Sequence, residues 1–142
     1  MNTNIIKYII FCFLIISCKS KTHEIEGHYE SYSPNKINHL ITLLSYDGYV
    51  DGTSLHLKRD KTFELLNCSM EIKGIWEVKL DSLYLTTNSK KFIIDSLNYD
   101  PKWSKMLKFN NIPSVYNIKK QYLSKIYKTE NGKIILEKLN KK

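Results

Sequence analysis

Short stretches in which apolar and polar residues alternate constrain the fold of this chain more than any other feature of its sequence. In residues 54–58, Leu55 and Leu57 share one face of a predicted strand, and Phe63 and Leu65 do the same after a turn. The alternation recurs in three later stretches, residues 73–79, 83–85 and 91–94. Turns at intervals of about 8–12 residues between short alternating strands favour a β-sandwich or β-barrel over a parallel sheet.

A first strand and a last hairpin flank this region. Residues 23–32 are predicted to form a strand, in which Gly27 marks a bulge or bend. Near the end of the chain, Asn131 and Gly132 form a dipeptide typical of hairpin turns, so residues 122–139 are predicted to fold back on themselves. About eight strands result. Eight antiparallel strands can close into a barrel whose interior holds side chains or one small ligand.

Two segments interrupt the β pattern with helical signals. Residues 33–44 place apolar side chains at helical spacing after Ser33, a suitable N-cap, although the same residues could form a strand. Asp100 and Pro101 suit the N-cap and the first position of a second helix of about two turns. The chain of 142 residues is predicted to hold one mainly β domain, an antiparallel barrel with one or two short helices. Its predicted core consists of Leu55, Leu57, Phe63, Leu65, Trp76, Val78, Leu83, Leu85, Phe92 and Ile94.

The first seventeen residues have the pattern of an export signal. An apolar run from Tyr8 to Ile16 follows Lys7. The run is too short to span a membrane as a helix, which takes about 20 residues. Its length matches the apolar region of a secretory signal, about 7–15 residues. A secretory signal that ends near a cysteine by coincidence, or a short buried helix, is the alternative.

The end of this run resembles the lipobox of bacterial lipoprotein signal peptides. That motif has an aliphatic residue, a tolerant position, a small residue and a cysteine, which are Ile15, Ile16, Ser17 and Cys18 here. The resemblance implies cleavage between Ser17 and Cys18 and attachment of lipid to the Cys18 thiol. We therefore expect a lipid-anchored protein of the bacterial cell envelope, in the outer membrane or periplasm. It divides the chain into a signal peptide that is removed, a lipidated tether and a single β-barrel domain, residues 1–17, 18–24 and 25–142.

Removal of the signal would leave one free thiol in the mature chain. Cys12 leaves with the signal and Cys18 becomes a thioether, so Cys68 has no partner for an intrachain disulfide. We interpret Cys68 as a small buried hydrophobic residue, because free cysteine is among the most buried residue types. A reactive or intermolecular thiol is the alternative.

The central strands resemble those of small bacterial lipoproteins with lipocalin-like barrels. In that family the first strand pair ends in an Asp-x-Thr-Phe turn and a Gly-x-Trp opens the next strand, as in residues 60–63 and 74–76 here. Asp-Ser-Leu-Tyr-Leu at 81–85 extends the similarity. The resemblance implies an eight-stranded lipocalin-like barrel and no particular ligand. The pattern also resembles the barrel of a copper-related envelope-stress lipoprotein. The Cys-x-x-Cys of that family is missing here, so metal or redox sensing is not carried over.

No group of residues has the spacing of a catalytic or metal site. The histidines, His23, His28, His39 and His56, do not have the spacing of converging ligands. Phosphate-binding loops and nucleophile elbows are also missing from the sequence. Asp60 and Asp81 are interpreted as turn formers. We therefore expect no enzyme activity, no metal site and no cofactor.

Positive charge is concentrated in the last third of the chain. Residues 18–100 contain 10 basic and 12 acidic residues, and residues 101–142 contain 11 and 2. A candidate patch for an anionic partner consists of Lys102, Lys105, Lys108, Lys119, Lys120 and Lys125. On an envelope protein such a patch would favour anionic lipids or acidic glycans. The alternative is a compositional lysine bias that keeps the chain soluble. Nucleic acid is not an expected partner, because Arg59 is the only arginine available for bidentate base contacts.

Two hypotheses for function follow. The first is a non-catalytic binding module for an apolar or anionic envelope ligand, held at the membrane by its N-terminal lipid. The second is a protein-interaction role, such as an inhibitor or immunity lipoprotein, because barrel-shaped lysozyme inhibitors are lipoproteins of similar size. A basic inhibitor would require an acidic target. A barrel interior filled with side chains would count against a small ligand inside it.

Overall fold

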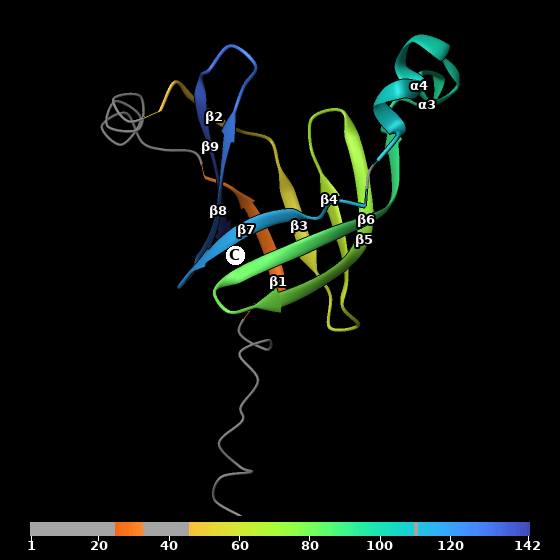
Figure 1. Ribbon diagram of the computed structural model, residues 1–142. Helices are drawn as coiled ribbons and strands as arrows, with labels where there is room; N and C mark the ends of the chain where they lie inside the picture. The colour runs from red at the N-terminus through yellow and green to blue at the C-terminus, as the bar shows by residue number, and fades with distance from the viewer. Residues whose placement is uncertain (1–24, 33–45, 110) are drawn as a thin grey trace, which may run out of the picture.

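The described part of the chain folds into nine strands and two short helices (Figure 1). The structure is a computed structural model that describes residues 25–32, 46–109 and 111–142. The strands are β1 (Gly27–Ser31), β2 (Gly48–Val50), β3 (Ser54–Leu57), β4 (Thr62–Leu66), β5 (Met70–Lys79), β6 (Ser82–Phe92), β7 (Ser114–Lys119), β8 (Tyr122–Lys128) and β9 (Ile134–Lys141). The helices, α3 (Asp95–Tyr99) and α4 (Pro101–Leu107), lie between β6 and β7.

Eight of these strands close into an antiparallel barrel. Their order is β1-β3-β4-β5-β6-β7-β8-β9, and β1 pairs again with β9 to complete the ring. At this closure Tyr29 lies opposite Lys141. The short β2 adds in parallel to β9, with Gly48 opposite Ile135. The predicted mainly β fold, an eight-stranded antiparallel barrel with short helices, is confirmed, and it fits a lipocalin-like barrel.

Three tight turns join β3 to β4, β5 to β6, and β7 to β8 at one end of the barrel, which we call the turn end. Each turn contains one residue with a left-handed backbone: Lys61 (φ 67°), Leu80 (φ 56°) and Lys120 (φ 30°). In the first turn, the Asp60 carboxylate accepts hydrogen bonds from the Thr62 amide and hydroxyl at 3.0 and 2.6 Å. These bonds hold the pKa of Asp60 below its usual value and confirm the residue as a turn former.

Both ends of the described domain lie at the turn end. β1 begins there soon after Ile25, and β9 ends there, where the Lys142 amide donates to the His28 carbonyl at 2.9 Å. The opposite end, which we call the loop end, carries the β4–β5 turn, the β8–β9 loop at 129–133, and both helices (Figure 1). Strand β6 connects the two ends with 11 residues.

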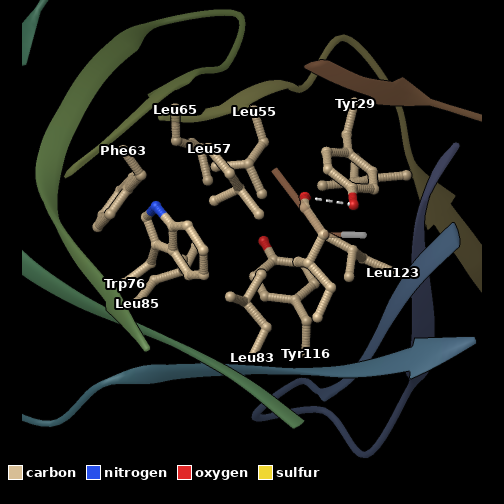
Figure 2. Packing of buried hydrophobic residues seen from close by; sticks show 12 residues of the cluster. Tyr29, Leu55, Leu57, Phe63, Leu65, Trp76, Leu83, Leu85, Tyr116 and Leu123 are labelled. Carbon is tan, nitrogen blue, oxygen red and sulfur yellow. Dashed lines mark hydrogen bonds between the residues drawn. The ribbon is translucent and has the colours of Figure 1, made fainter. Parts of the chain in front are cut away.

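The barrel interior is filled by large side chains (Figure 2). Twelve buried residues form one cluster, each at most 9% exposed: Ile25, Tyr29, Leu55, Leu57, Phe63, Leu65, Trp76, Leu83, Leu85, Tyr116, Leu123 and Leu139. Of the predicted core, Val78 is partly buried against this cluster and Phe92 is buried. Ile94 was predicted to be buried and is 62% exposed, because β6 ends at Phe92 and Ile94 precedes α3.

Gly74 allows β5 and β6 to approach closely. The ladder between these strands shifts register between Lys73 and Gly74, as at a β-bulge. A Cβ on Gly74 would lie 1.9 Å from the Thr86 carbonyl oxygen and 2.8 Å from Cε1 of Phe63. The position therefore admits no side chain without displacing backbone.

The loop-end connections confirm two predictions and correct others. The Asp100 side chain accepts a hydrogen bond from the Lys102 amide at 2.8 Å, and α4 begins at Pro101 as predicted. The predicted hairpin joins β8 to β9, with Gly132 left-handed at φ 78°. Helix α3 was not predicted. Residues 83–85 and 91–94 were predicted as separate strands, but 83–85 and 91–92 belong to the single strand β6 and 93–94 lie beyond its end. The helix predicted at 33–44 lies outside the described residues.

Candidate functional site

The predicted lipidation site lies outside the described part of the chain. This applies to Cys18 and to the predicted cleavage after Ser17. Among the described residues, no helix is long and apolar enough to cross a membrane. The same residues include no group of three or more His, Cys, Asp or Glu side chains that could hold a metal ion.

Cys68 was predicted to be buried and is exposed. It lies between β4 and β5, in a turn where the Asn67 side chain accepts hydrogen bonds from the Ser69 and Met70 amides at 3.0 and 2.8 Å. Its Sγ is 4.0 Å from the Asp51 carbonyl oxygen. The prediction was wrong because the residue occupies a turn, where no inward-facing strand position is available.

The six lysines of the candidate patch are distributed over three places. Lys102, Lys105 and Lys108 lie on α4 or directly after it, at the loop end. Lys119 and Lys120 lie at the turn end, where Lys119 is the last residue of β7 and Lys120 belongs to the turn before β8. Figure 1 shows α4 and the β7–β8 turn on opposite sides of the barrel.

Lys125 occupies the third place, in the barrel wall. Its Nζ donates to Ser114 Oγ at 3.2 Å and lies 4.5 Å from the ring centroid of Tyr127. Burial lowers the pKa of Lys125, and the nearby Glu137 carboxylate opposes this effect. This lysine is therefore part of an internal cluster, whereas Lys102 and Lys119 face solvent.

A buried carboxylate lies opposite Lys125 in the β8–β9 ladder. Glu137 is 2% exposed and accepts hydrogen bonds from the hydroxyls of Tyr116, at 2.9 Å, and Tyr127. Burial, assisted by the carboxylate, raises the pKa of both tyrosines above the usual value. A buried polar group that loses its partner is costly, so these bonds hold β7, β8 and β9 together at the loop end.

Sequence reasoning missed this cluster, although a signal for it exists. Glu137 follows Ile135 and precedes Leu139 at a spacing of two, which puts the carboxylate on the face of β9 that carries the buried Leu139. A carboxylate at a core-facing position of a strand is unusual and predicts a hydrogen-bonded partner nearby.

A hollow of about 190 Å³ opens at the turn end. Its lining residues are Ile25, Tyr29, Val78, Leu80, Asp81, Ile118, Lys120, Tyr122 and Leu123. The Tyr29 hydroxyl donates to the Ile25 carbonyl at 2.7 Å, and burial raises the pKa of Tyr29 to about 12. Sites for drug-sized molecules usually measure about 300–1,000 Å³, so this hollow suits at most a small group.

The two helices and their flanking residues, 93–109 and 111–112, form a projection that we call the arm. Neither helix contains a buried residue. Seven large apolar side chains on the arm are 36–86% exposed: Ile93, Ile94, Tyr99, Trp103, Met106, Phe109 and Ile112. The Asn98 side chain fixes the arm to the barrel, because it accepts from the Phe92 amide at 2.7 Å and donates to the Phe92 carbonyl at 3.1 Å.

Lysines alternate with the apolar residues of α4. Lys102, Lys105 and Lys108 are exposed, and no acidic residue occurs between positions 101 and 129. Tyr, Trp, Phe and Met are enriched at protein interfaces, and large exposed apolar patches mark interaction sites. The arm therefore has the composition of a binding surface for a partner with apolar and acidic groups.

Comparisons with known proteins assign the chain to no family. No family model, no curated protein and no solved structure matches it.

Proposed function

We propose that this chain is a lipid-anchored protein of the bacterial outer membrane that acts as a non-catalytic binding module. The lipobox-like residues Ile15, Ser17 and Cys18 support the anchor. The arm is the main support for a binding function, because its exposed aromatic and aliphatic side chains are interleaved with lysines.

The filled interior favours binding at the surface over binding inside the barrel. Leu55, Leu57 and Leu83 lie in the middle of the core (Figure 2), and these three residues and Leu139 are each at most 1% exposed. A small apolar ligand would have to displace such side chains, at the cost of their packing. Binding of an apolar ligand inside the barrel is therefore the weaker version of the binding hypothesis.

An acidic protein is the partner that fits the arm best. Trp103, Met106 and Phe109 provide anchors of the kind that dominate binding energy at interfaces. Lys102 and Lys105 would add attraction to carboxylates and faster association. The protein-interaction role, such as an inhibitor or immunity lipoprotein directed at an acidic target, is thus the form of binding that the arm supports.

Affinity capture from envelope extract tests this function. The mature protein should retain a stoichiometric acidic protein at low salt. Trp103→Ala should weaken this retention about 30-fold, the effect of a typical hot-spot residue. Lys102→Glu with Lys105→Glu should also weaken it, and the matched control is Lys128→Glu with Lys133→Glu at the β8–β9 loop.

Two results would contradict the proposal. Equal retention by the arm variants and the control pair would show that the arm is not the binding surface. Retention of lipid or glycan alone would contradict a protein partner. Mass spectrometry of the mature N-terminus tests the anchor separately, because the proposal requires a chain that begins at an acylated Cys18.

A further inference from the structure

The chain enters the barrel at the turn end. Residues 18–24 separate the proposed lipid site from the described domain and span at most about 25 Å when fully extended. Strand β6, with 11 residues, would measure about 36 Å along its length and roughly 28 Å along the axis of a barrel with ordinary strand tilt. The turn end is therefore the part of the domain nearest to an anchor at Cys18, and the arm is one barrel length farther away.

Basic residues outnumber acidic ones in the three tight turns. Residues 58–61, 79–82 and 119–122 contain six basic and two acidic residues. Some of this charge is used internally, since the Lys61 ammonium lies 3.7 Å from the ring centroid of Trp76. Arg59 and Lys79 each lie near a glutamate carboxylate, at 3.6 and 2.6 Å.

Lys119 and Lys120 are different, because their charge is not used within the described domain. Both side chains are exposed. In the part of the chain that the structure describes, neither has an acidic side chain at salt-bridge distance. Their charge is available to an anion outside the protein, and they extend from the end where the tether begins.

Leu80 adds an apolar group to the same end. It is 92% exposed and adopts a left-handed backbone conformation that disfavours a side chain of its size. Glycine or asparagine would suit this turn better. Leu80 and Lys120 both line the hollow at the turn end, so the apolar and basic groups lie close together. A protruding apolar residue beside lysines is typical of protein surfaces that enter the lipid headgroup region.

We propose that the turn end is the membrane-facing surface of the domain and that it rests on anionic phospholipid headgroups. Lys119 and Lys120 contact the headgroups, and Leu80 enters the interface. The inference rests on the proposed anchor at Cys18, which holds this end close to a bilayer. In this orientation the arm faces away from the anchoring membrane and is accessible to a protein partner.

Lysine labelling of the lipidated protein tests the orientation. The mature protein is reconstituted into vesicles of phosphatidylcholine alone or with added phosphatidylglycerol, treated with an amine-reactive reagent, and mapped by mass spectrometry. Each lysine near an anionic surface changes association about fivefold, so two lysines favour the seated orientation about 25-fold. In the anionic vesicles alone, the labelling of Lys119 and Lys120 should be reduced by up to about 25-fold. Lys102 and Lys133 should be labelled equally in both kinds of vesicle.

Variants separate the contribution of the two lysines. Lys79 lies in the neighbouring turn and should also be protected in the anionic vesicles. Replacing Lys119 and Lys120 by glutamine should remove this protection of Lys79. The control, Lys128→Gln with Lys133→Gln, should retain it. Salt near 1 M, where the Debye length is about 3 Å, should also abolish the protection. Equal labelling of Lys119 in both vesicles, or protection of Lys102 in its place, would overturn the inference.

The same digest reports on the anchor independently. Its N-terminal peptide shows whether Cys18 carries lipid, and this result does not depend on the labelling of Lys119. A lipidated chain with unprotected Lys119 would refute the membrane-facing surface and leave the proposed anchor intact. An unlipidated chain would refute the anchor, and protection of Lys119 on added anionic vesicles would still support the surface.

Discussion

Removal of one hydroxyl from the buried cluster around Glu137 tests whether that cluster stabilises the loop end. In Tyr116→Phe the ring keeps its place in the core, and the 2.9 Å hydrogen bond to the Glu137 carboxylate is lost. Tyr127 remains as a donor to the same oxygen. The substitution therefore changes one hydrogen bond and leaves the packing unchanged.

The expected effect follows from the burial of the acceptor. A hydrogen bond to a charged group contributes about 1.5–3 kcal/mol, and Glu137, at 2% exposure, has little access to water as a replacement donor. We expect the free energy of unfolding to fall by about 2 kcal/mol. For a domain of this size, such a change lowers the melting temperature by roughly 8 °C.

Urea unfolding followed by circular dichroism measures this change. The dependence of the free energy on urea should keep its slope, because the surface exposed on unfolding is nearly unchanged. The control is Tyr99→Phe, which removes a hydroxyl from a residue that is 86% exposed and should cost at most about 0.5 kcal/mol. Equal stability of the two variants would refute the assignment of a stabilising role to the Tyr116 hydroxyl.

Three further predictions concern the barrel itself. Gly74→Ala should lower the free energy of unfolding in urea by about 3 kcal/mol, because the new Cβ meets the Thr86 carbonyl oxygen. The control, Gly48→Ala, should have little effect, since no atom lies within 4 Å of its new Cβ. Equal losses of stability in the two variants would contradict this reasoning. Leu80→Gly should raise that free energy by about 1 kcal/mol by relieving left-handed strain, and an unchanged urea midpoint would disprove the strain. The free energy of unfolding should fall as the pH rises from 10 to about 12. Burial raises the pKa of Tyr29 to about 12 in the folded state, so the folded state holds the phenol proton more tightly than the unfolded chain does. Tyr29→Phe should make this loss shallower in urea titrations across that range, and an identical loss would exclude Tyr29 as its source.

Alternation of apolar residues predicted the barrel because it reports directly which side of a strand is buried. The pairs Leu55 with Leu57 and Leu83 with Leu85 face the core as predicted. Turn chemistry was equally informative, since Asp60 and Asp100 make the hydrogen bonds expected of them. These signals are local, so a single sequence contains them.

Strand length was predicted less well, because hydrophobic alternation reports burial and not backbone pairing. Residues 86–90 of β6 are polar and only partly buried or exposed, and the sequence therefore suggests a loop between two short strands. In the structure they continue the ladder, with Thr86 opposite Ile75 and Lys90 opposite Ile72.

The sequence predicted which lysines could form a basic patch, but it did not predict where the fold places them. A count of charges along the chain groups Lys102 with Lys119, and the fold places them at different ends of the barrel. The exposure of Trp103 and Met106 was not predicted either, because apolar residues on one helical face ordinarily indicate packing against a core. Only the position of the arm outside the barrel shows that, among the described residues, the two side chains do not belong to the core cluster.

The pairing of Tyr29 with Lys141 brings both ends of the described domain to the turn end. This position decides where a tag can be added for experiments. A peptide tag added after Lys142 would lie at the turn end, between the domain and the proposed membrane surface. The β8–β9 loop at 129–133 is at the other end, and its residues 130–133 are exposed. Insertion of a tag there leaves every strand of the barrel intact. The same proximity of the two ends favours a circular permutant in which a short linker joins them and new termini open in that loop.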